Sequence, residues 1–436
     1  MTYGELDRRA SILAHSLQAY VKPGDVVCVH ADRSINWIVA YYGILKAGAA
    51  FSSTDATLPQ HIRNMNAETA GANVYLTPHD SQKSAKPDSC ELCFSVDELI
   101  PEDPMAERMP HREVPRPEDT AYICFTSGTT GRPKGVICHH AGLVALQSDL
   151  EVRLRAAPGE RVAQFLNPAF DGSILEVFSA LSYGATLVLT DGVDPFSQLR
   201  RATTAIMTPS IARVLDPADF PDLKAIYLGG EPLPQEINDK WAAVKPTYNQ
   251  YGPTEASCAS TIQPLKPGRR VAIGPPNPTT RIYILDRNKQ LVPPGVVGEI
   301  YCAGVQVANG YIGQPELTAD KFLPDTICKR GQKMYRTGDR AFFNHRGEVE
   351  CLGRNDRQIK LRGFRTDLND IEARAAGAIK EASATVICPK EDYLVCMMQP
   401  ETLDIASVRS RLVKVLPVHA GKPMFLIFLI WEPLLT

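Results

Sequence analysis

The segment Thr126-Ser-Gly-Thr-Thr-Gly-Arg-Pro-Lys134-Gly135 holds four hydroxyl side chains, three glycines and a lysine within ten residues. It follows the apolar run Ala121–Phe125, which predicts a buried strand. It precedes residues 141–154, where four leucines at helical spacing predict a helix. A strand, a glycine-rich polar loop and a helix, in this order, are typical of the backbone that surrounds a phosphate group.

The residue types of this loop suit an anion. Glycines allow backbone N–H groups to approach a phosphate, hydroxyls add short donors, and a lysine supplies a mobile positive charge. The spacing is not that of the Walker sequence, so the common nucleotide-binding loop is excluded. A surface turn with one solvated lysine would explain Gly-Thr-Thr-Gly alone, but not the whole composition. The predicted phosphate-binding residues are Thr126, Ser127, Gly128, Thr129, Thr130, Gly131 and Lys134.

The length and composition indicate a globular protein of more than one domain. The chain has 436 residues, of which 44% are hydrophobic and 22% are charged. The net charge of −2 argues against nucleic acid or an anionic membrane as the main partner. The longest apolar run, Met424–Trp431, is too short to cross a bilayer, and no secretory signal is recognised. Eleven scattered cysteines favour a reduced, cytoplasmic protein.

The order of the expected elements predicts the architecture. In the middle of the chain, short β-rich runs alternate with segments of helical spacing, which favours parallel α/β layers. These runs are Thr186–Thr190, Thr204–Thr208 and Ala225–Gly230. The later runs Arg281–Asp286 and Gly298–Gly304 have no helix between them and predict a smaller β-rich subdomain. Residues 80–118, rich in charge and proline, are expected to form a surface excursion.

The pattern changes again at Glu348, where strands and two helices predict a small α+β unit. The polar segment Gly353-Arg-Asn-Asp356 is the expected joint. We therefore predict an α/β fold in which residues 1–352 form a large multi-layer N-terminal core of β-sheets and helices, including the β-rich subdomain. Residues 353–436 are expected to form a small α+β C-terminal lid.

Three polar stretches are ambiguous when each is taken alone. Asn249–Glu255 and Tyr335–Asp339 suit either turns or a site, and the cationic residues from Gly353 to Arg365 suit either a solvated face or an anion. Together, in this order, they resemble the adenylate-forming superfamily, which includes acyl-CoA ligases, luciferases and the adenylation domains of nonribosomal peptide synthetases. The adenylation domains of fungal synthetase-like enzymes are the most similar. The resemblance rests on Thr2–Leu6, Leu45–Gly48, Thr126–Lys134, Gly229–Glu231, Tyr251–Glu255, Gly298–Glu299, Gly310–Tyr311, Tyr335–Asp339 and Gly353–Glu372.

The resemblance implies a site for ATP and Mg²⁺. In the family, the loop that ends at Lys134 holds the β- and γ-phosphates. Thr254 would contact the α-phosphate and Glu255 would bind Mg²⁺, so Lys134, Thr254 and Glu255 are the expected catalytic residues. Asp339 would accept both ribose hydroxyls, and Arg354 would lie beside the ribose. The adenine site would be lined by Gly229, Gly230, Glu231 and Tyr251.

Asp171 decides the expected class of substrate. In amino-acid-activating members, an aspartate at this place in Phe170-Asp-Gly-Ser173 pairs with the substrate's α-ammonium, whereas acyl- and aryl-acid ligases generally lack it. The alternative role is that of N-cap for a helix over Ile174–Leu181. The matching pocket positions imply a mid-sized, mostly apolar pocket with a tyrosine and a glutamine as polar groups. They are Asp171, Gly172, Leu175, Ile206, Tyr227, Gln250, Cys258 and Ala259.

The implied reaction converts ATP and an amino acid into an aminoacyl adenylate and pyrophosphate. The lid would then rotate about Asp356, and the aminoacyl group would pass to the phosphopantetheine thiol of a carrier protein. No carrier domain is recognised in the sequence. An acyl- or aryl-acid CoA ligase is the first alternative.

A nucleotide-binding remnant with impaired catalysis is the second alternative. In the family, a lysine in a C-terminal Gly-Lys segment bridges the carboxylate and the α-phosphate. That segment is expected to begin near Glu432–Thr436, and Lys422 stands too early in the sequence to be its lysine.

Overall fold

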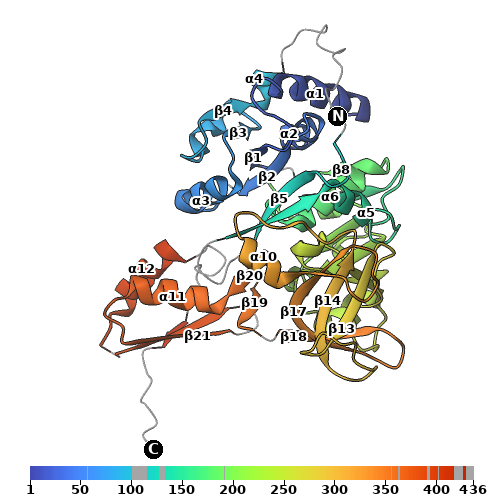
Figure 1. The fold of residues 1–436 in the computed structure, drawn as a ribbon, viewed down its shortest axis with the longest axis vertical. Coiled ribbons are helices and arrows are strands. Elements are labelled where there is room, and N and C mark those ends of the chain that lie inside the picture. The colour runs from blue at the N-terminus through green and yellow to red at the C-terminus, as the bar shows by residue number, and fades with distance from the viewer. Residues whose placement is uncertain are drawn as a thin grey trace, which may run out of the picture.

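The structure is a computed structural model, and its described strands form five sheets of seven, six, five, two and three strands. Figure 1 shows the first three sheets stacked with their helices and the last two standing to one side. The structure describes residues 1–55, 57–100, 115–126, 133–190, 192–354, 356–361, 364–389, 393–400, 402–416 and 426–428.

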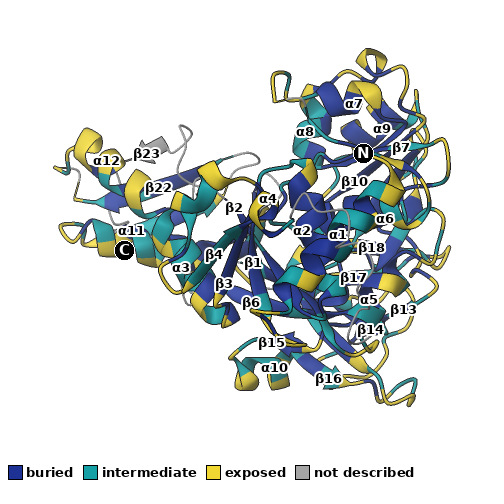
Figure 2. Cartoon of the chain, turned by 90° about the horizontal axis from the view of Figure 1, so that it is seen from above, coloured by how far each residue is buried: buried dark blue, intermediate teal, exposed yellow. Residues whose placement is uncertain are grey.

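The seven-stranded sheet is built mainly from the N-terminal part of the chain, in the order β15-β6-β5-β2-β1-β3-β4. β1 pairs in parallel with β2 and β3, and its near-continuous apolar sequence is typical of a strand that is covered on both faces. Figure 2 shows this part of the sheet in the buried colour. The strands are β1 Val26–Ala31, β2 Ala50–Asp55, β3 Val74–Thr77, β4 Leu92–Ser95, β5 Thr120–Thr126, β6 Lys134–His139 and β15 Gly310–Tyr311. The helices are α1 Tyr3–Leu17, α2 Ile35–Lys46, α3 Gln60–Ala70, η1 Asp80–Ala85, α4 Val96–Leu99 and α5 His140–Leu146.

The six-stranded sheet, in the order β12-β11-β10-β9-β7-β8, confirms the predicted parallel layers. Its neighbouring strands pair in parallel except β12, which runs antiparallel to β11. The strands are β7 Arg161–Ala163, β8 Thr186–Val188, β9 Thr204–Met207, β10 Ala225–Gly229, β11 Thr247–Tyr251 and β12 Thr261–Pro264. The helices are α6 Asp171–Ser182, α7 Ser197–Arg201, α8 Pro209–Val214, η3 Pro217–Asp219, α9 Gln235–Ala242 and η4 Thr254–Ala256.

The five-stranded sheet confirms the β-rich subdomain, because all of its pairs are antiparallel. Its strands are β13 Thr280–Leu285, β14 Gly298–Gly304, β16 Phe322–Pro324, β17 Lys333–Phe343 and β18 Val349–Arg354, with α10 Pro315–Lys321 beside them. β18 pairs with β17 from Phe343↔Val349 to Asp339↔Arg354. The strand that was predicted to open the C-terminal unit at Glu348 therefore belongs to this sheet.

The C-terminal elements have a hydrophobic core of their own, which includes Leu361, Ile371, Leu394 and Leu412. A β-hairpin and a three-stranded sheet in the order β21-β22-β23 pack with two helices. The strands are β19 Gln358–Leu361, β20 Phe364–Asp367, β21 Ala384–Pro389, β22 Leu394–Gln399 and β23 Leu426–Phe428, and the helices are α11 Leu368–Ala378 and α12 Ile405–Val415. The fold is therefore α/β, with mixed sheets, an antiparallel subdomain and a small α+β part.

Three local predictions are wrong. The loop after β5 leads into a second strand, because β6 pairs antiparallel with β5 out to Thr126↔Lys134. The following helix, α5, ends at Leu146 rather than at residue 154. Within residues 80–118, β4 joins the large sheet beside β3, since Leu92–Phe94 is a short apolar run in a polar stretch. Residues 101–114 lie outside the described residues.

None of the helices in the described part of the chain combines the length and the apolar character that a membrane crossing requires. The eleven cysteines are free thiols, and those inside the strands β1, β5 and β14 are buried, as expected for cysteine that packs as a small hydrophobe.

Candidate nucleotide and substrate site

A cavity of about 1010 Å³ lies where the two large sheets, the antiparallel sheet and the C-terminal elements meet. Its wall includes the ends of β5, β10, β11 and β18, the start of α6, and residues of β19 and α11. Most of the predicted site residues that the structure describes lie in or next to this wall. Segments far apart in the sequence are therefore brought to one place.

The described ends of the predicted phosphate loop are Thr126 and Lys134, which face each other across the β5–β6 pair. Thr126 and Pro133 line the cavity. The side chain of Lys134 is buried, and its Nζ lies 5.9 Å from the ring centroid of Tyr311, within the range of a cation–π contact. Ser127, Gly128, Thr129, Thr130 and Gly131 lie outside the described residues.

A carboxylate network lies at the boundary between the antiparallel sheet and the C-terminal elements. Tyr251 donates its hydroxyl to Asp339 Oδ2 at 2.5 Å, and Arg354 donates through Nη1 to Asp339 Oδ1 at 3.0 Å. Arg354 also forms a two-point pair with Asp356, at 2.8 and 2.9 Å. Burial and the nearby Asp339 carboxylate raise the pKa of the Tyr251 hydroxyl, which stays protonated as a donor.

The Glu255 carboxyl is fully buried beside this network. Its Oε1 accepts a hydrogen bond from the hydroxyl of Tyr311 at 2.6 Å, and the two hydroxyls of Tyr311 and Tyr335 lie 3.2 Å apart. The sequence identifies Tyr311 only as part of the motif Gly310–Tyr311. Its contact with Glu255 depends on the pairing of β15 with β6. The preceding residue, Thr254, lines the cavity.

Gly229 ends β10 at the cavity wall, and Gly230 follows it. A methyl group added at Gly229 would lie 2.8 Å from the carbonyl oxygen of Gln250 on the neighbouring strand, so only glycine fits. Gly230 has a φ of 83°, a conformation that glycine adopts without strain. Glu231 accepts hydrogen bonds from Ser210, from the backbone N–H at 2.8 Å and from the hydroxyl at 2.6 Å. Within the described residues, its buried Oε1 has no partner.

Asp171 is the first residue of α6, whose N-cap is Phe170. The alternative role as N-cap of a helix beginning at Ile174 is therefore wrong, because the helix starts three residues earlier. The Asp171 Oδ1 accepts a hydrogen bond from Gly172 N at 2.8 Å. Burial raises the pKa of the Asp171 carboxyl, and the hydroxyl of Thr254 opposes this rise by stabilising the charged form.

The predicted substrate positions divide into two layers. Asp171, Gly172, Ile206, Gln250 and Cys258 line the cavity, whereas Leu175, Tyr227 and Ala259 pack in the hydrophobic cluster next to it.

The Tyr227 hydroxyl donates to Glu151 Oε2 at 3.0 Å, and its ring stacks on Tyr248 with the centroids 4.8 Å apart. Gln250 is buried in the cavity wall, and within the described residues neither atom of its side-chain amide has a hydrogen-bond partner. Of the two predicted polar groups, the Gln250 amide rather than the Tyr227 hydroxyl is therefore available to a ligand.

Lys360 of β19 also lines the cavity, and sequence reasoning noticed it only as part of a cationic strand. Its positive charge lowers the pKa of Asp171, so it acts on the centre of the proposed substrate site from the C-terminal elements. Lys422 and the other residues from 417 to 425 lie outside the described residues.

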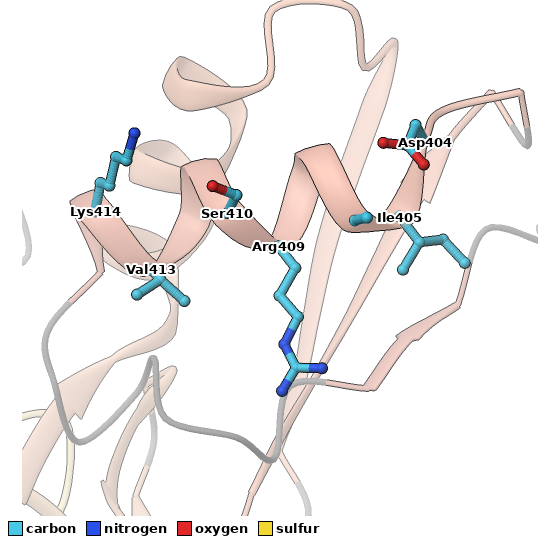
Figure 3. Close-up of a pocket in the computed structure, with 7 residues that line it drawn as sticks. Asp404, Ile405, Arg409, Ser410, Val413 and Lys414 are labelled. Carbon is cyan, nitrogen blue, oxygen red and sulfur yellow. The ribbon is translucent and has the colours of Figure 1, made fainter.

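A second, shallow depression lies on the outer face of α12 (Figure 3), where Ile405, Arg409 and Val413 stand beside one another. It contains none of the predicted site residues. The candidate site is the cavity between the sheets.

Comparison with known proteins identifies relatives of the chain. Residues 1–312 match the family of AMP-binding enzymes. The chain is 51% identical over 424 residues to the nonribosomal peptide synthetase aclP of Aspergillus oryzae, and 51% identical over 421 residues to the nonribosomal peptide synthetase ataP of Aspergillus terreus. Each alignment covers 96% of this chain but only 26% and 28% of the relatives, so the chain spans about a quarter of their length.

Solved structures have the same fold. PA1221, an NRPS protein containing adenylation and PCP domains, superposes with a TM-score of 0.85 at 25% identity, covering 98% of this chain and 88% of that one. Its holo form, bound to a vinylsulfonamide inhibitor, gives a TM-score of 0.82 at 26% identity, covering 94% and 73%. With the family match over most of the chain, these likenesses show that the protein belongs to the AMP-binding enzymes, among the adenylation domains of nonribosomal peptide synthetases.

Proposed function

We propose that the protein activates an amino-acid carboxylate with ATP, forms an aminoacyl adenylate with release of pyrophosphate, and passes the aminoacyl group to the pantetheine thiol of a carrier protein. The observation that carries the proposal is the half-buried Asp171 carboxyl in the same cavity as Tyr251 and Asp339. One carboxyl can pair with the substrate's ammonium group, and the other can accept ribose hydroxyls.

The nucleotide side of the proposal uses the family's known reactant, since AMP-binding enzymes use ATP. Adenine would lie against Gly229, Gly230, Glu231 and Tyr251, and the ribose against Asp339 with Arg354 beside it. The glycines support this assignment, because Gly229 lets β10 approach β11 closely and Gly230, with its positive φ, turns the chain at the cavity wall. Thr126, the loop that follows it, and Lys134 would hold the β- and γ-phosphates.

Mg²⁺ fits the proposed site through Glu255. The described residues contain no cluster of three or more metal-binding side chains, so these residues alone offer no closed metal cage. Magnesium is commonly bound by one or two carboxylates together with substrate phosphates. Glu255 would supply that carboxylate next to Thr254, with Tyr311 fixing its Oε1. When bound, the ion neutralises charge on the phosphates.

The reaction brings two anions together, so hydrogen-bond donors and positive charges of the protein must offset their repulsion. The substrate carboxylate forms a bond to the α-phosphorus, and the bond from that phosphorus to pyrophosphate breaks. Thr254 would donate to the α-phosphate, and Lys134 would stabilise the pyrophosphate as it leaves. Asp171 would hold the ammonium group of the amino acid so that its carboxylate faces the phosphorus.

We further propose that residues 1–352 act as the core and residues 353–436 as a lid, with Asp356 as the hinge. The separate hydrophobic core of the C-terminal elements and the Asp356–Arg354 pair at the joint support this division. A carrier protein would approach the cavity after the lid turns. The free, largely buried thiols suit a protein that works in the cytoplasm.

Pyrophosphate exchange over a panel of amino acids and of carboxylic acids without an amine tests the proposal. Exchange that depends on an α-amino acid is expected. Exchange driven only by acids that lack the amine would instead support an acyl- or aryl-acid CoA ligase, and Asp171→Asn would then leave the rate unchanged.

A further inference from the structure

A buried carboxyl outside the proposed reaction lies on α6, the helix that begins at Asp171 (Figure 1). Glu176 is fully buried, and burial raises the pKa of this carboxyl to about 8. An uncompensated carboxylate would be costly at such a place, so its surroundings must supply donors. Neither the sequence motifs nor the proposed chemistry assigns a role to this residue.

The donors around Glu176 come from the loop between β7 and α6. The Oε1 atom accepts hydrogen bonds from the backbone N–H groups of Phe165 and Leu166, both at 3.1 Å. The Oε2 atom accepts from Leu166 N at 3.3 Å and from Gln164 Nε2 at 3.2 Å. Arg33 donates through Nη2 to the carbonyl oxygen of Leu166 at 3.3 Å, and its charge stabilises the Glu176 carboxylate. Both the N–H group and the carbonyl group of Leu166 are thus held by hydrogen bonds.

The clamped loop forms the cavity wall that leads to Asp171. Phe165 and Leu166 line the cavity, as do Asn167 and the residues from Ala169 to Gly172. A methyl group added at Gly172 would lie 2.4 Å from Leu166 Cδ1, so the side chain of Leu166 packs directly against the start of α6. A shift of Leu166 would therefore displace the first turn of α6, which carries Asp171.

We propose that Glu176 is a positioning residue for the amino-acid substrate: it holds the backbone of Phe165 and Leu166 and thereby fixes the cavity wall beside Asp171. The inference rests on the proposed function, because it assigns Glu176 to the amino-acid side of the cavity. The adenine and ribose positions lie on other elements, β10, β11, β17 and β18. Loss of the clamp should therefore affect the amino acid more than ATP.

The test compares Glu176→Gln with the wild-type chain. Glutamine keeps the volume and one accepting oxygen, but above pH 8, where Glu176 is ionised, its amide presents a donor to one of the three donors around Glu176. The KM for the amino acid in pyrophosphate exchange is expected to rise roughly 5- to 30-fold, while the KM for ATP stays within about twofold. Hydrogen exchange at the amides of Phe165 and Leu166 is expected to become faster.

Val177→Ala is the matched control. Val177 is fully buried on the same helix but belongs to the cluster under the seven-stranded sheet, away from the clamped loop. It should lower the melting temperature and leave the KM for the amino acid unchanged. An unchanged KM in Glu176→Gln, or an equal rise in Val177→Ala, would overturn the proposal.

Two further measurements keep the outcome decisive. If Glu176→Gln does not fold, Arg33→Gln removes one of the two side-chain donors to the Leu166 carbonyl oxygen, the other being Gln164 Nε2 at 2.8 Å, and should raise the KM for the amino acid in the same direction; no rise would count against the clamp. If the wild-type chain exchanges pyrophosphate with no amino acid, the proposed function fails. The amide exchange of Phe165 and Leu166 then decides separately whether Glu176 holds the loop.

Discussion

At Asp171, burial and hydrogen bonding act in opposite directions on one carboxyl. Burial raises its pKa, while the Thr254 hydroxyl, the Lys360 charge and the Gly172 N–H favour the ionised form. The ionised form of a carboxyl in such surroundings is stabilised most strongly when a cation binds next to it. The proposed ammonium partner would provide that cation, and both the affinity for the substrate and the stability of the protein should respond.

We predict that Asp171→Asn weakens the binding of the amino acid selectively. The charge-assisted hydrogen bond is worth about 1.5–3 kcal/mol, so the KM for the amino acid should rise roughly 10- to 150-fold. The KM for ATP should change little, because Asp171 does not belong to the proposed nucleotide contacts. Pyrophosphate exchange at saturating ATP measures the effect. Unchanged kinetics would leave Asp171 without a role in binding.

The pH dependence follows from the raised pKa of Asp171. Because the ammonium group pairs with the ionised form, the KM for the amino acid should fall as the pH rises through that pKa, and Asp171→Asn should remove this dependence. The folded state holds the proton more tightly than the unfolded state, so the contribution of Asp171 to stability declines over the same pH window. The free energy of unfolding of Asp171→Asn relative to wild type should therefore increase from pH 4 to pH 8 in denaturant titrations. A constant difference would contradict the raised pKa.

Among the described residues, both side-chain amide atoms of Gln250 in the cavity wall lack a hydrogen-bond partner. Gln250→Leu should raise the free energy of unfolding of the ligand-free protein by about 1–2 kcal/mol, because it replaces buried, unpaired amide atoms with apolar ones. Asn249→Leu is the control, since Asn249 Nδ2 donates to the carbonyl oxygen of Ala272 at 2.8 Å, and it should be destabilising. Equal destabilisation by both changes would show that the amide of Gln250 is satisfied.

At the scale of the elements, the leucine spacing after the phosphate loop misled the helix prediction. Leu143 and Leu146 do lie on a helix, but Leu154 has a φ of 58° and packs in the cluster beside the substrate pocket. Because Leu146 packs in the same cluster as Leu154, the spacing reflects shared burial rather than one continuous helix. The residues Val136–Cys138, which are β-branched or small, form the strand that pairs with β5. A local pattern could not show this pairing, because it depends on the neighbouring strand.

The close approach of β10 and β11 gives a prediction for Gly229. Alanine at this position would bring its methyl group to 2.8 Å from the carbonyl oxygen of Gln250, so the strands must separate. Gly229→Ala should cost about 1–3 kcal/mol of stability and weaken ATP binding, as measured by denaturant titration and calorimetry. Gly377→Ala in α11, where no described atom lies within 4 Å of the added methyl group, should be neutral or slightly stabilising. Similar effects of both changes would argue against a tight fit at Gly229.

At the scale of the whole molecule, Arg354 connects the antiparallel sheet to the first residues of the C-terminal part. Its bonds to Asp339 and Asp356 bridge the proposed ribose site and the proposed hinge. Any ligand that takes the Asp339 oxygens would compete with this bridge. The two parts of the molecule are therefore coupled at a site that also belongs to the nucleotide.

We predict that Arg354→Ala exposes the joint to proteolysis. Cleavage by thermolysin beside apolar residues such as Leu352 and Ile359 should rise by roughly fivefold or more, since proteolysis reports the population of opened states. Arg357→Ala is the control, because Arg357 pairs with Glu372 inside the C-terminal part. An unchanged cleavage rate in Arg354→Ala would show that these ion pairs do not hold the joint closed.

The sequence by itself determined the elements with strong periodic signals, such as β1, α2 and the parallel strands of the second sheet. It also located Gly229, Gly230 and the carboxylates Asp171, Glu255 and Asp339, because their motifs, taken together in this order, resemble those of one family. Only the tertiary structure decided that Tyr311 hydrogen-bonds to Glu255, that Tyr227 is committed to Glu151, and that Glu176 clamps a loop. These contacts join residues from separate elements, and the packing of sheets, which no local pattern encodes, brings them together.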